Sequence, residues 1–238
     1  MIDRVASWMR AAERVVVLTG AGISAESGVP VFRGAGGLWR QFRPEQLATP
    51  EAFRRQPELV WAWYLWRRAR IAEVQPNAGH LAIARWQQQR AGVSLLTQNV
   101  DGLHARAGSV QAIELHGSVW RVRCAAGCGF STQDEPTGAP RTSFACACGG
   151  GLRPDVVWFG EPLDAIDAAI ARVEEAGVLV VVGTSAVVYP VAALPRIAQR
   201  RGARIVEVNV EETALTTVAD AVLRGPAAEV LPALASAS

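Results

Sequence analysis

Residues 15–33 read VVVLTGAGISAESGVPVFR, and this stretch is the most informative part of the chain about its fold. The apolar run 15–18 predicts a buried parallel strand that leads into Gly20-Ala21-Gly22 at the start of a helix. Such a turn binds phosphate, because glycines let the backbone approach a pyrophosphate and the helix N-terminus supplies free N–H groups. Ala25 replaces the third glycine of the usual dinucleotide-binding pattern, and a Pro-containing segment then ends in Phe32-Arg33. The stretch therefore predicts a phosphate-binding turn with a further loop, and not simple cofactor docking.

Apolar strand patterns alternate with helical patterns along most of the chain. The expected strands are 14–18, 93–97, 112–115, 178–182, 204–208 and 220–223, and the expected helices are 78–91, 163–176, 190–202 and 226–235. This alternation predicts an α/β fold with a Rossmann-like doubly wound parallel sheet and right-handed crossovers. Asn77 is expected to cap the helix that begins at residue 78.

Two segments interrupt the alternation. Residues 34–76 are rich in Arg and aromatic residues with a helical pattern, and residues 119–153 hold all four cysteines with little helical period. We expect both to form a smaller module over the ligand edge of the sheet. The predicted division is a Rossmann-like domain of residues 1–33, 77–118 and 154–238, and a small domain of residues 34–76 and 119–153, the latter segment as a zinc ribbon.

The composition limits the classes of function. Half of the 238 residues are hydrophobic, the net charge is only +2, and all 24 basic residues are Arg. A charge this small argues against nucleic acid as a partner. No apolar run reaches the ~18 residues of a membrane span, and residues 1–4 show no signal pattern. We expect a cytoplasmic monomer with no membrane partner.

The four cysteines lie within 25 residues, at Cys124, Cys128, Cys146 and Cys148. In a cytoplasmic protein such clustering favours a metal over disulfides, with scattered core cysteines as the alternative. Four thiolates would close a tetrahedron around Zn²⁺ and leave no open position, so the predicted ion is structural. The short Cys146-x-Cys148 spacing departs from the usual C-x2-C pair.

Several further motifs follow predicted strands. They are TQNVDGLH at 97–104, ELHGS at 114–118, VVWFGE at 156–161, GTS at 183–185 and VN at 208–209. Together with residues 20–33 and the cysteines, this order resembles the sirtuins from about residue 14 to 232. The resemblance implies NAD⁺-dependent removal of acyl groups from protein lysines, so that acylated proteins are the expected partners and NAD is consumed.

The resemblance also implies roles for individual residues. The pyrophosphate would be held by Gly20, Ala21, Gly22 and Ser24, and the nicotinamide ribose would be covered by Phe32 and Arg33. The nicotinamide site would be lined by Gln98, Asn99 and Asp101. Phosphate and the adenine ribose would be bound by Gly183, Thr184, Ser185 and Asn209. Asn99 is expected to be catalytic beside His116. In the implied reaction the acyl oxygen displaces nicotinamide, and His116 deprotonates a ribose hydroxyl as general base. Free lysine and O-acyl-ADP-ribose are then released.

The other two histidines are expected to be structural: His80 lies in the first turn of a helix, and His104 follows the QNVD motif. The segment Val157, Trp158, Phe159 and Gly160 would pair with an extended peptide as an added strand.

The acyl group is suggested by Tyr64 and Arg67, whose spacing of three places both on one face of a helix expected over 58–73. Arg binds a carboxylate bidentately and Tyr adds a donor. The pair, with Ala48 as the small residue that widens the acyl channel, looks like the class III sirtuins, which remove succinyl and malonyl groups. The alternative is that Arg67 lies on a solvated face and Tyr64 only packs, which leaves a deacetylase without acidic-acyl preference.

Three other functions compete with this interpretation. A dehydrogenase would regenerate its cofactor, but the missing third glycine and the His116-Gly117 strand end disfavour it. An ADP-ribosyltransferase would use the same NAD⁺ cleavage and label a protein. A zinc-ribbon binding module without catalysis is disfavoured by the small net charge and the His116 motif.

Overall fold

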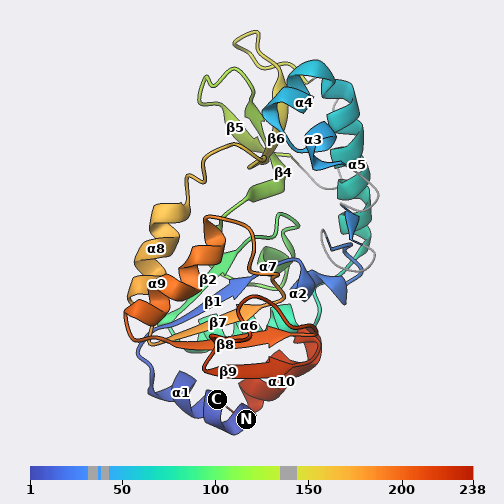
Figure 1. The fold of residues 1–238 in the computed structure, drawn as a ribbon. Helices are drawn as coiled ribbons and strands as arrows, with labels where there is room; N and C mark the ends of the chain where they lie inside the picture. Colours follow the sequence, from blue (N-terminus) through green and yellow to red (C-terminus); the bar gives the residue numbers. More distant parts are fainter. Residues whose placement is uncertain (32–36, 39–42, 135–143, 238) are drawn as a thin grey trace.

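The structure is a computed structural model that describes residues 1–31, 37–38, 43–134 and 144–237. The predicted site residues Phe32 and Arg33 lie outside the described residues. A larger parallel sheet with helices on both faces carries a smaller module of antiparallel strands and helices at one edge (Figure 1).

The larger sheet has six parallel strands in the order β3-β2-β1-β7-β8-β9. Their bounds are β1 (Val15–Thr19), β2 (Val93–Thr97), β3 (Ile113–Glu114), β7 (Val178–Val182), β8 (Arg204–Asn209) and β9 (Ala221–Arg224). β1 is central, with Val17 opposite Leu95 of β2 and Val180 of β7. The order reverses direction at β1 and β7, so the switch point predicted for ligand binding lies at their carboxyl ends.

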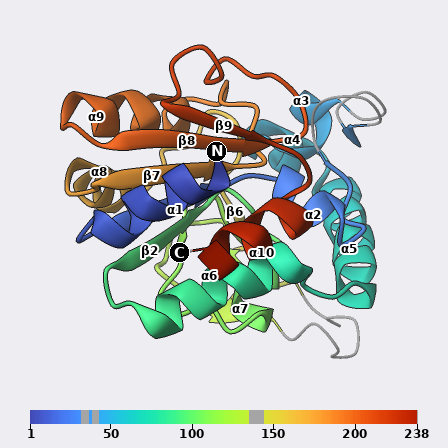
Figure 2. The same ribbon diagram turned by 90° about the horizontal axis from the view of Figure 1, so that it is seen from below.

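Two helical layers cover the sheet. One face carries α1 (Ile2–Ala11), α6 (Ala78–Gln89) and α10 (Ala227–Ala237), and the other carries α8 (Ile166–Glu174), the short 3-10 helix η2 (Val191–Ala193) and α9 (Leu194–Arg200) (Figure 2). Alternate residues of β1 serve the two layers: Val15 and Val17 pack with the first, and Val16 and Leu18 with the second. This burial on both faces explains the unbroken apolar run of the strand.

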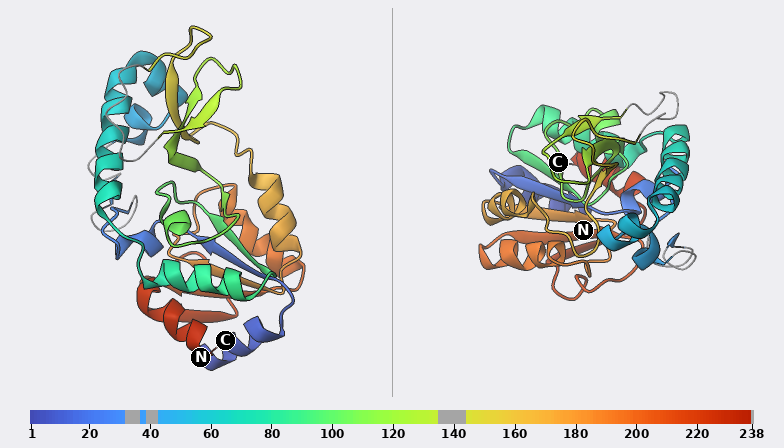
Figure 3. Two further views of the ribbon diagram at one scale, coloured as in Figure 1. Left: turned by 180° about the vertical axis from the view of Figure 1, so that it is seen from behind. Right: turned by 90° about the horizontal axis from the view of Figure 1, so that it is seen from above.

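The smaller module combines a three-stranded antiparallel sheet with helices. Its elements are β4 (Gly117–Cys124), β5 (Ser131–Gln133), β6 (Leu152–Val156), α3 (Pro44–Leu47), α4 (Pro50–Arg55) and α5 (Pro57–Glu73). The long helix α5 extends from the antiparallel sheet toward the larger sheet (Figure 3). A separate apolar core, which includes Trp61, Trp120 and Trp158, joins these elements. Two short helices, α2 (Gly22–Ala25) and α7 (Leu103–Arg106), follow β1 and β2.

The structure confirms the Rossmann-like class and each predicted strand of the larger sheet. The predicted strand 112–115 is shorter, at two residues, while α1 was not predicted. Asn77 caps α6 as expected, since its Oδ1 accepts the N–H of Gly79 at 2.9 Å. The division into domains stays a prediction; the antiparallel sheet itself begins at Gly117 and ends at Val156. Across the described ranges, no helix combines the length and hydrophobicity that crossing a membrane requires.

Candidate functional site

A cavity of about 730 Å³ lies where the carboxyl ends of β1, β2, β7 and β8 meet the smaller module. Its volume is within the range of small-molecule sites. The predicted site residues on its wall are Gly20, Ala21, Gly22, Ala48, Tyr64, Arg67, Gln98, Asn99, His116, Val157, Trp158, Phe159, Gly160, Gly183, Thr184, Ser185 and Asn209. Residues from eight separate segments of the chain are thus brought to one cavity.

The glycines of the turn after β1 allow two loops to touch. A Cβ added at Gly22 would lie 2.7 Å from the Cα of Gly183, and one at Gly20 would lie 2.8 Å from its carbonyl oxygen. The N–H of Gly22 also donates to that carbonyl at 2.7 Å. The glycines are therefore required by the packing of the β1 turn against the end of β7, in addition to any approach of a ligand.

Two predicted site residues, Ser24 and Asp101, lie beneath the cavity wall instead of on it. Both are buried, and the Ser24 hydroxyl donates to Asp101 at 2.8 Å and accepts from the Asn99 amide at 3.1 Å. Burial raises the pKa of Asp101 above its ordinary value, while the N–H of Leu103 and the Ser24 hydroxyl oppose that shift. Through these bonds the pair fixes the amide of Asn99, which does reach the cavity.

The orientation of His116 is set by a backbone carbonyl. Its Nδ1 lies 3.0 Å from the carbonyl oxygen of Gln98, so Nδ1 carries the proton and the Nε2 lone pair is left for the cavity. Burial lowers the pKa of His116 below its ordinary value, against a smaller opposing effect of that hydrogen bond. A neutral imidazole with an open Nε2 is the form in which histidine accepts a proton.

The far side of the cavity is held by side-chain amides that join neighbouring strand ends. The Gln98 amide donates to the Thr184 hydroxyl at 3.0 Å, and the Asn209 amide donates to the Thr184 carbonyl at 3.0 Å. Asn209 also accepts the N–H of Val210 at 2.9 Å. These bonds place polar groups at the carboxyl ends of β2, β7 and β8. The residue that ends β8 is Asn209, which carries a neutral amide and not a carboxylate.

The opposite end of the cavity is formed by α5 and the segment after β6. Tyr64 and Arg67 of α5 are both buried there, and Ala48 lies beside them on the wall. The Arg67 guanidinium lies over the rings of Trp63 and Tyr64, at 4.9 Å and 5.7 Å from their centroids. Burial raises the pKa of Tyr64, so its hydroxyl remains protonated at neutral pH. A buried guanidinium beside a hydroxyl suits a carboxylate ligand.

The segment predicted to pair with a peptide uses its own N–H groups inside the protein. The N–H of Val157 donates to the carbonyl of His116 at 3.0 Å, and that of Phe159 donates to the carbonyl of Ala48 at 3.0 Å. The N–H of Trp158 donates to Glu161 at 2.8 Å. The Trp158 carbonyl also accepts the N–H of Glu161 at 3.0 Å, so a peptide that pairs with this segment must use its other backbone groups.

His80 and His104 are buried away from the cavity, as packing roles predict. Their rings lie 4.8 Å apart, and burial lowers the pKa of His80 to about 4 and that of His104 to about 3. His80 completes the capping box of α6 with Asn77, and His104 contacts the Thr19 hydroxyl at 2.9 Å. Both rings are neutral at neutral pH, and they hold the first turn of α6 and the end of β1 in place.

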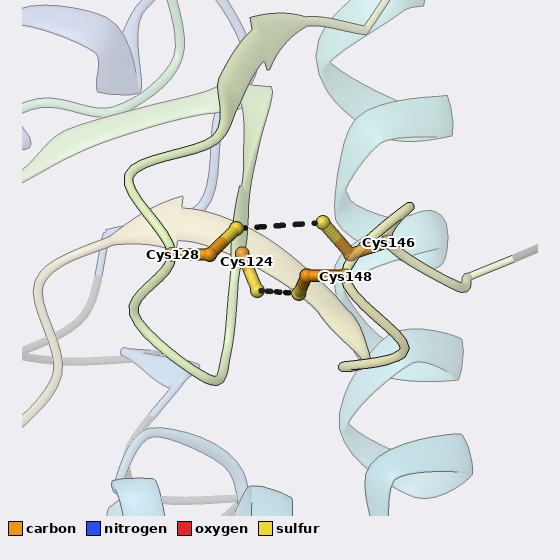
Figure 4. Close-up of side chains that lie close together, drawn as sticks. All are labelled: Cys124, Cys128, Cys146 and Cys148. Atoms are coloured by element: carbon orange, nitrogen blue, oxygen red, sulfur yellow. Dashed lines mark hydrogen bonds between the residues drawn. The ribbon is translucent and has the colours of Figure 1, made fainter.

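The four cysteine sulfurs face one another between the β4–β5 turn and the loop before β6 (Figure 4). All four Sγ atoms lie within 4.8 Å of one another, and the Cys124–Cys148 and Cys128–Cys146 pairs are separated by 3.5 Å and 3.7 Å. Zn–S bonds of about 2.3 Å at tetrahedral angles place sulfurs roughly 3.8 Å apart, so the cluster fits Zn²⁺. The N–H of Cys128 lowers the pKa of the Cys124 thiol, while the neighbouring sulfurs raise that of Cys128, so the thiols of the cluster titrate together.

The sequence motifs did not identify every residue of the cavity wall. Trp63 and the stretches 210–213 and 225–227 also line it. The last two follow the carboxyl ends of β8 and β9, so their place after predicted strands was a signal that could have identified them. Trp63 gave no such signal, because its helix neighbours Trp61 and Trp66 have the same side chain and do not line the cavity.

Comparisons with known proteins identify the family of the chain. The model of the Sir2 family matches residues 20–190. An "NAD-dependent protein deacylase 2" of Pyrobaculum aerophilum is 53% identical over 232 residues, which cover 97% of this chain and 93% of the relative. A solved Sir2 homologue in complex with NAD is 47% identical with a TM-score of 0.90, covering 98% of this chain and 92% of that one.

A more distant solved structure is a Sir2 His-to-Ala variant with a deacetylated p53 peptide and 3′-O-acetyl ADP-ribose. It is 30% identical with a TM-score of 0.85, and the match covers 99% of this chain and 97% of that one. The family model spans well over half of the chain, and the relatives match it almost from end to end. The chain therefore belongs to the Sir2 family.

Proposed function

We propose that the protein is an NAD-dependent protein-lysine deacylase that prefers acidic acyl groups such as succinyl and malonyl. One observation carries the proposal. A single cavity is lined by the glycine turn after β1, by His116, whose Nδ1 faces the Gln98 carbonyl, and by the buried Tyr64 and Arg67.

The dinucleotide end is formed by Gly20, Gly22 and the loop at Gly183, with backbone groups and little side-chain bulk. NAD supplies an activated ribose–nicotinamide bond when it is bound. The amide of Asn99, held by Ser24 beneath it, would orient the nicotinamide ribose. Phe32 and Arg33, outside the described residues, are proposed to cover that ribose and exclude water.

His116 is proposed to act as the general base. The Gln98 carbonyl holds the proton at Nδ1, so Nε2 can take a proton from a ribose hydroxyl. Its lowered pKa keeps this nitrogen unprotonated at neutral pH. The protein therefore needs no rearrangement of the ring before it accepts the proton.

At the acyl end, Arg67 and Tyr64 would hold the terminal carboxylate of the acyl group, and Ala48 leaves room for its extra carbons. A carboxylate placed in this buried pocket without a cation would lose hydration without compensation. Arg67 supplies that cation, which favours a succinyl group over the neutral acetyl group. The segment 157–160 is proposed to pair with the substrate peptide through backbone groups other than the Trp158 carbonyl, which accepts the N–H of Glu161.

One Zn²⁺ that stabilises the antiparallel sheet is proposed to be held by Cys124, Cys128, Cys146 and Cys148. Four sulfur ligands leave no position for a substrate, which agrees with a structural role. The sulfur cluster also forms no part of the cavity wall.

The experiment that tests the proposal is nicotinamide release with acetyl-, malonyl-, succinyl- and glutaryl-lysine peptides, comparing wild type with Arg67→Met and Tyr64→Phe. We expect both changes to reduce kcat/KM for the acidic substrates far more than for acetyl-lysine. Arg70→Met, at an exposed position of the same helix, is the matched control and should change neither. An equal loss for acetyl and succinyl substrates would refute the acidic-acyl preference.

A further inference from the structure

The hydroxyl of Tyr64 has one partner within the part of the chain that the structure describes, and that partner is the indole N–H of Trp158. The Nε1 atom lies 2.8 Å from the hydroxyl oxygen, and both side chains are buried. The two residues come from α5 and from the segment after β6, 94 positions apart in the chain. Their contact joins the two sides of the acyl end of the cavity.

The chemistry of the two groups sets the direction of the hydrogen bond. An indole N–H can only donate, whereas a phenol can donate one proton and accept at its oxygen. Tyr64 must therefore be the acceptor, and its own O–H proton has no described acceptor in the protein. That proton remains available to a ligand in the cavity, which Tyr64 lines.

The indole is itself held in place by Arg153 and Glu161. The Arg153 guanidinium lies 3.3 Å from the centroid of the Trp158 ring, and it donates to the Glu161 carboxylate and to the Val156 carbonyl at 2.9 Å and 2.7 Å. The same carboxylate accepts the backbone N–H of Trp158 at 2.8 Å. Glu161 therefore fixes both the backbone and the stacking partner of the indole.

We propose that Trp158 is a positioning residue for acyl specificity: its indole N–H occupies the acceptor side of the Tyr64 hydroxyl and so directs the O–H proton toward the acyl carboxylate. This inference rests on the proposed acidic-acyl function and adds to it the residue that orients the donor. Arg67 supplies the charge, and the Trp158–Tyr64 bond supplies the direction of the second contact. An acetyl group has no carboxylate to receive that proton.

The first test compares the ratio of kcat/KM for succinyl-lysine to that for acetyl-lysine. Trp158→Phe removes the N–H and keeps an aromatic ring against Arg153. We expect this ratio to fall about tenfold, the effect of losing one oriented hydrogen bond to a charged group. Tyr64→Phe should lower the ratio at least as much, and Trp158→Phe should lower it no further when Tyr64 is already Phe.

Trp61→Phe is the matched control. Trp61 is also buried, and its indole N–H donates to the Leu152 carbonyl at 3.0 Å and not to Tyr64. The substitution removes an equivalent bond from the same apolar core and should leave the ratio within about twofold. If Trp158→Phe reduces both substrates equally, or still lowers the ratio in the Tyr64→Phe background, the positioning role is wrong.

A second measurement examines the hydrogen bond without catalysis. In ¹⁵N-labelled protein, the Trp158 indole resonance is the one of eight Trp signals that disappears in Trp158→Phe. In Tyr64→Phe we expect that resonance to move upfield, because the N–H has lost its acceptor, while the Trp61 resonance stays in place. If the Trp158 resonance does not move, the hydrogen bond to Tyr64 is absent and the inference is wrong, whichever acyl group the protein prefers.

The two proposals fail in different ways. If Arg67→Met leaves the succinyl-to-acetyl ratio unchanged, the acidic-acyl function is wrong and the positioning role falls with it. If Arg67→Met lowers the ratio and Trp158→Phe does not, the acidic-acyl function stands and only the role of Trp158 is overturned.

Discussion

Removal of the imidazole in His116→Ala should abolish the acid limb of the pH–rate profile. In the wild-type protein burial lowers the pKa of His116 below its ordinary value, and the Gln98 carbonyl holds the proton at Nδ1. Only the neutral ring accepts a proton, so kcat/KM should rise with pH through the pKa of His116 and then level off. Because burial keeps this pKa below the ordinary histidine value, the ring is neutral at neutral pH.

The size of the effect follows from general base catalysis. A positioned base typically contributes about 10²- to 10⁴-fold to the rate, or roughly 3–5 kcal/mol in the barrier. His116→Ala should lose that factor on the plateau. Binding of NAD should change much less, because the contacts of the Gly20–Gly22 turn with the Gly183 loop do not involve the imidazole.

The assay is deacetylation of an acetyl-lysine peptide between about pH 5 and about pH 8, since this acyl group does not titrate in that range. Added imidazole should restore part of the activity of His116→Ala and bring back an acid limb. An acid limb unchanged in His116→Ala, or a plateau rate of His116→Ala equal to that of the wild type, would refute the assignment of His116 as the base.

Three further predictions concern the framework of the site. Cys124→Ser should abolish stoichiometric zinc in elemental analysis and lower the Tm; retention of one zinc per chain would contradict the four-sulfur site. Gly22→Ala places a Cβ 2.7 Å from the Cα of Gly183, so we expect about 1–3 kcal/mol of destabilisation in urea unfolding and weaker binding of NAD. Gly151→Ala is the control, because a Cβ added there has only one neighbouring atom, at 4.0 Å, and its stability should stay near that of the wild type. Asn77→Ala removes the cap of α6 and should lower the free energy of unfolding by about 1 kcal/mol; an unchanged value would show that the cap contributes nothing.

The larger sheet could be predicted from the sequence because its central strands, β1 and β7, are buried on both faces. The runs at 15–18 and 178–182 are apolar at every position, which few structures other than a covered parallel strand explain. The antiparallel sheet gave a weaker signal. β4 alternates buried hydrophobic residues with Arg121 and Arg123, which form ion pairs with Glu114, Asp155 and Glu161, and such pairs cannot be foreseen from spacing.

The sequence motifs located the cavity but not the hydrogen bonds within it. Each motif lies at the end of a strand, so parallel pairing alone brings His116 and Gly22 to one edge. The burial of Ser24 and Asp101 beneath the wall depends on the path of the turn after β1. The contact of Trp158 with Tyr64 depends on how the smaller module packs, across 94 residues of sequence.

Mass spectrometry of a succinyl-lysine peptide incubated with the protein and NAD⁺ detects desuccinylation and its products together. We predict that the peptide loses the succinyl group, that nicotinamide appears in equal amount, and that O-succinyl-ADP-ribose is the third product. Arg67→Met should strongly reduce all three signals. A peptide that keeps its succinyl group while acetyl-lysine is processed, or one that gains ADP-ribose, would contradict the account.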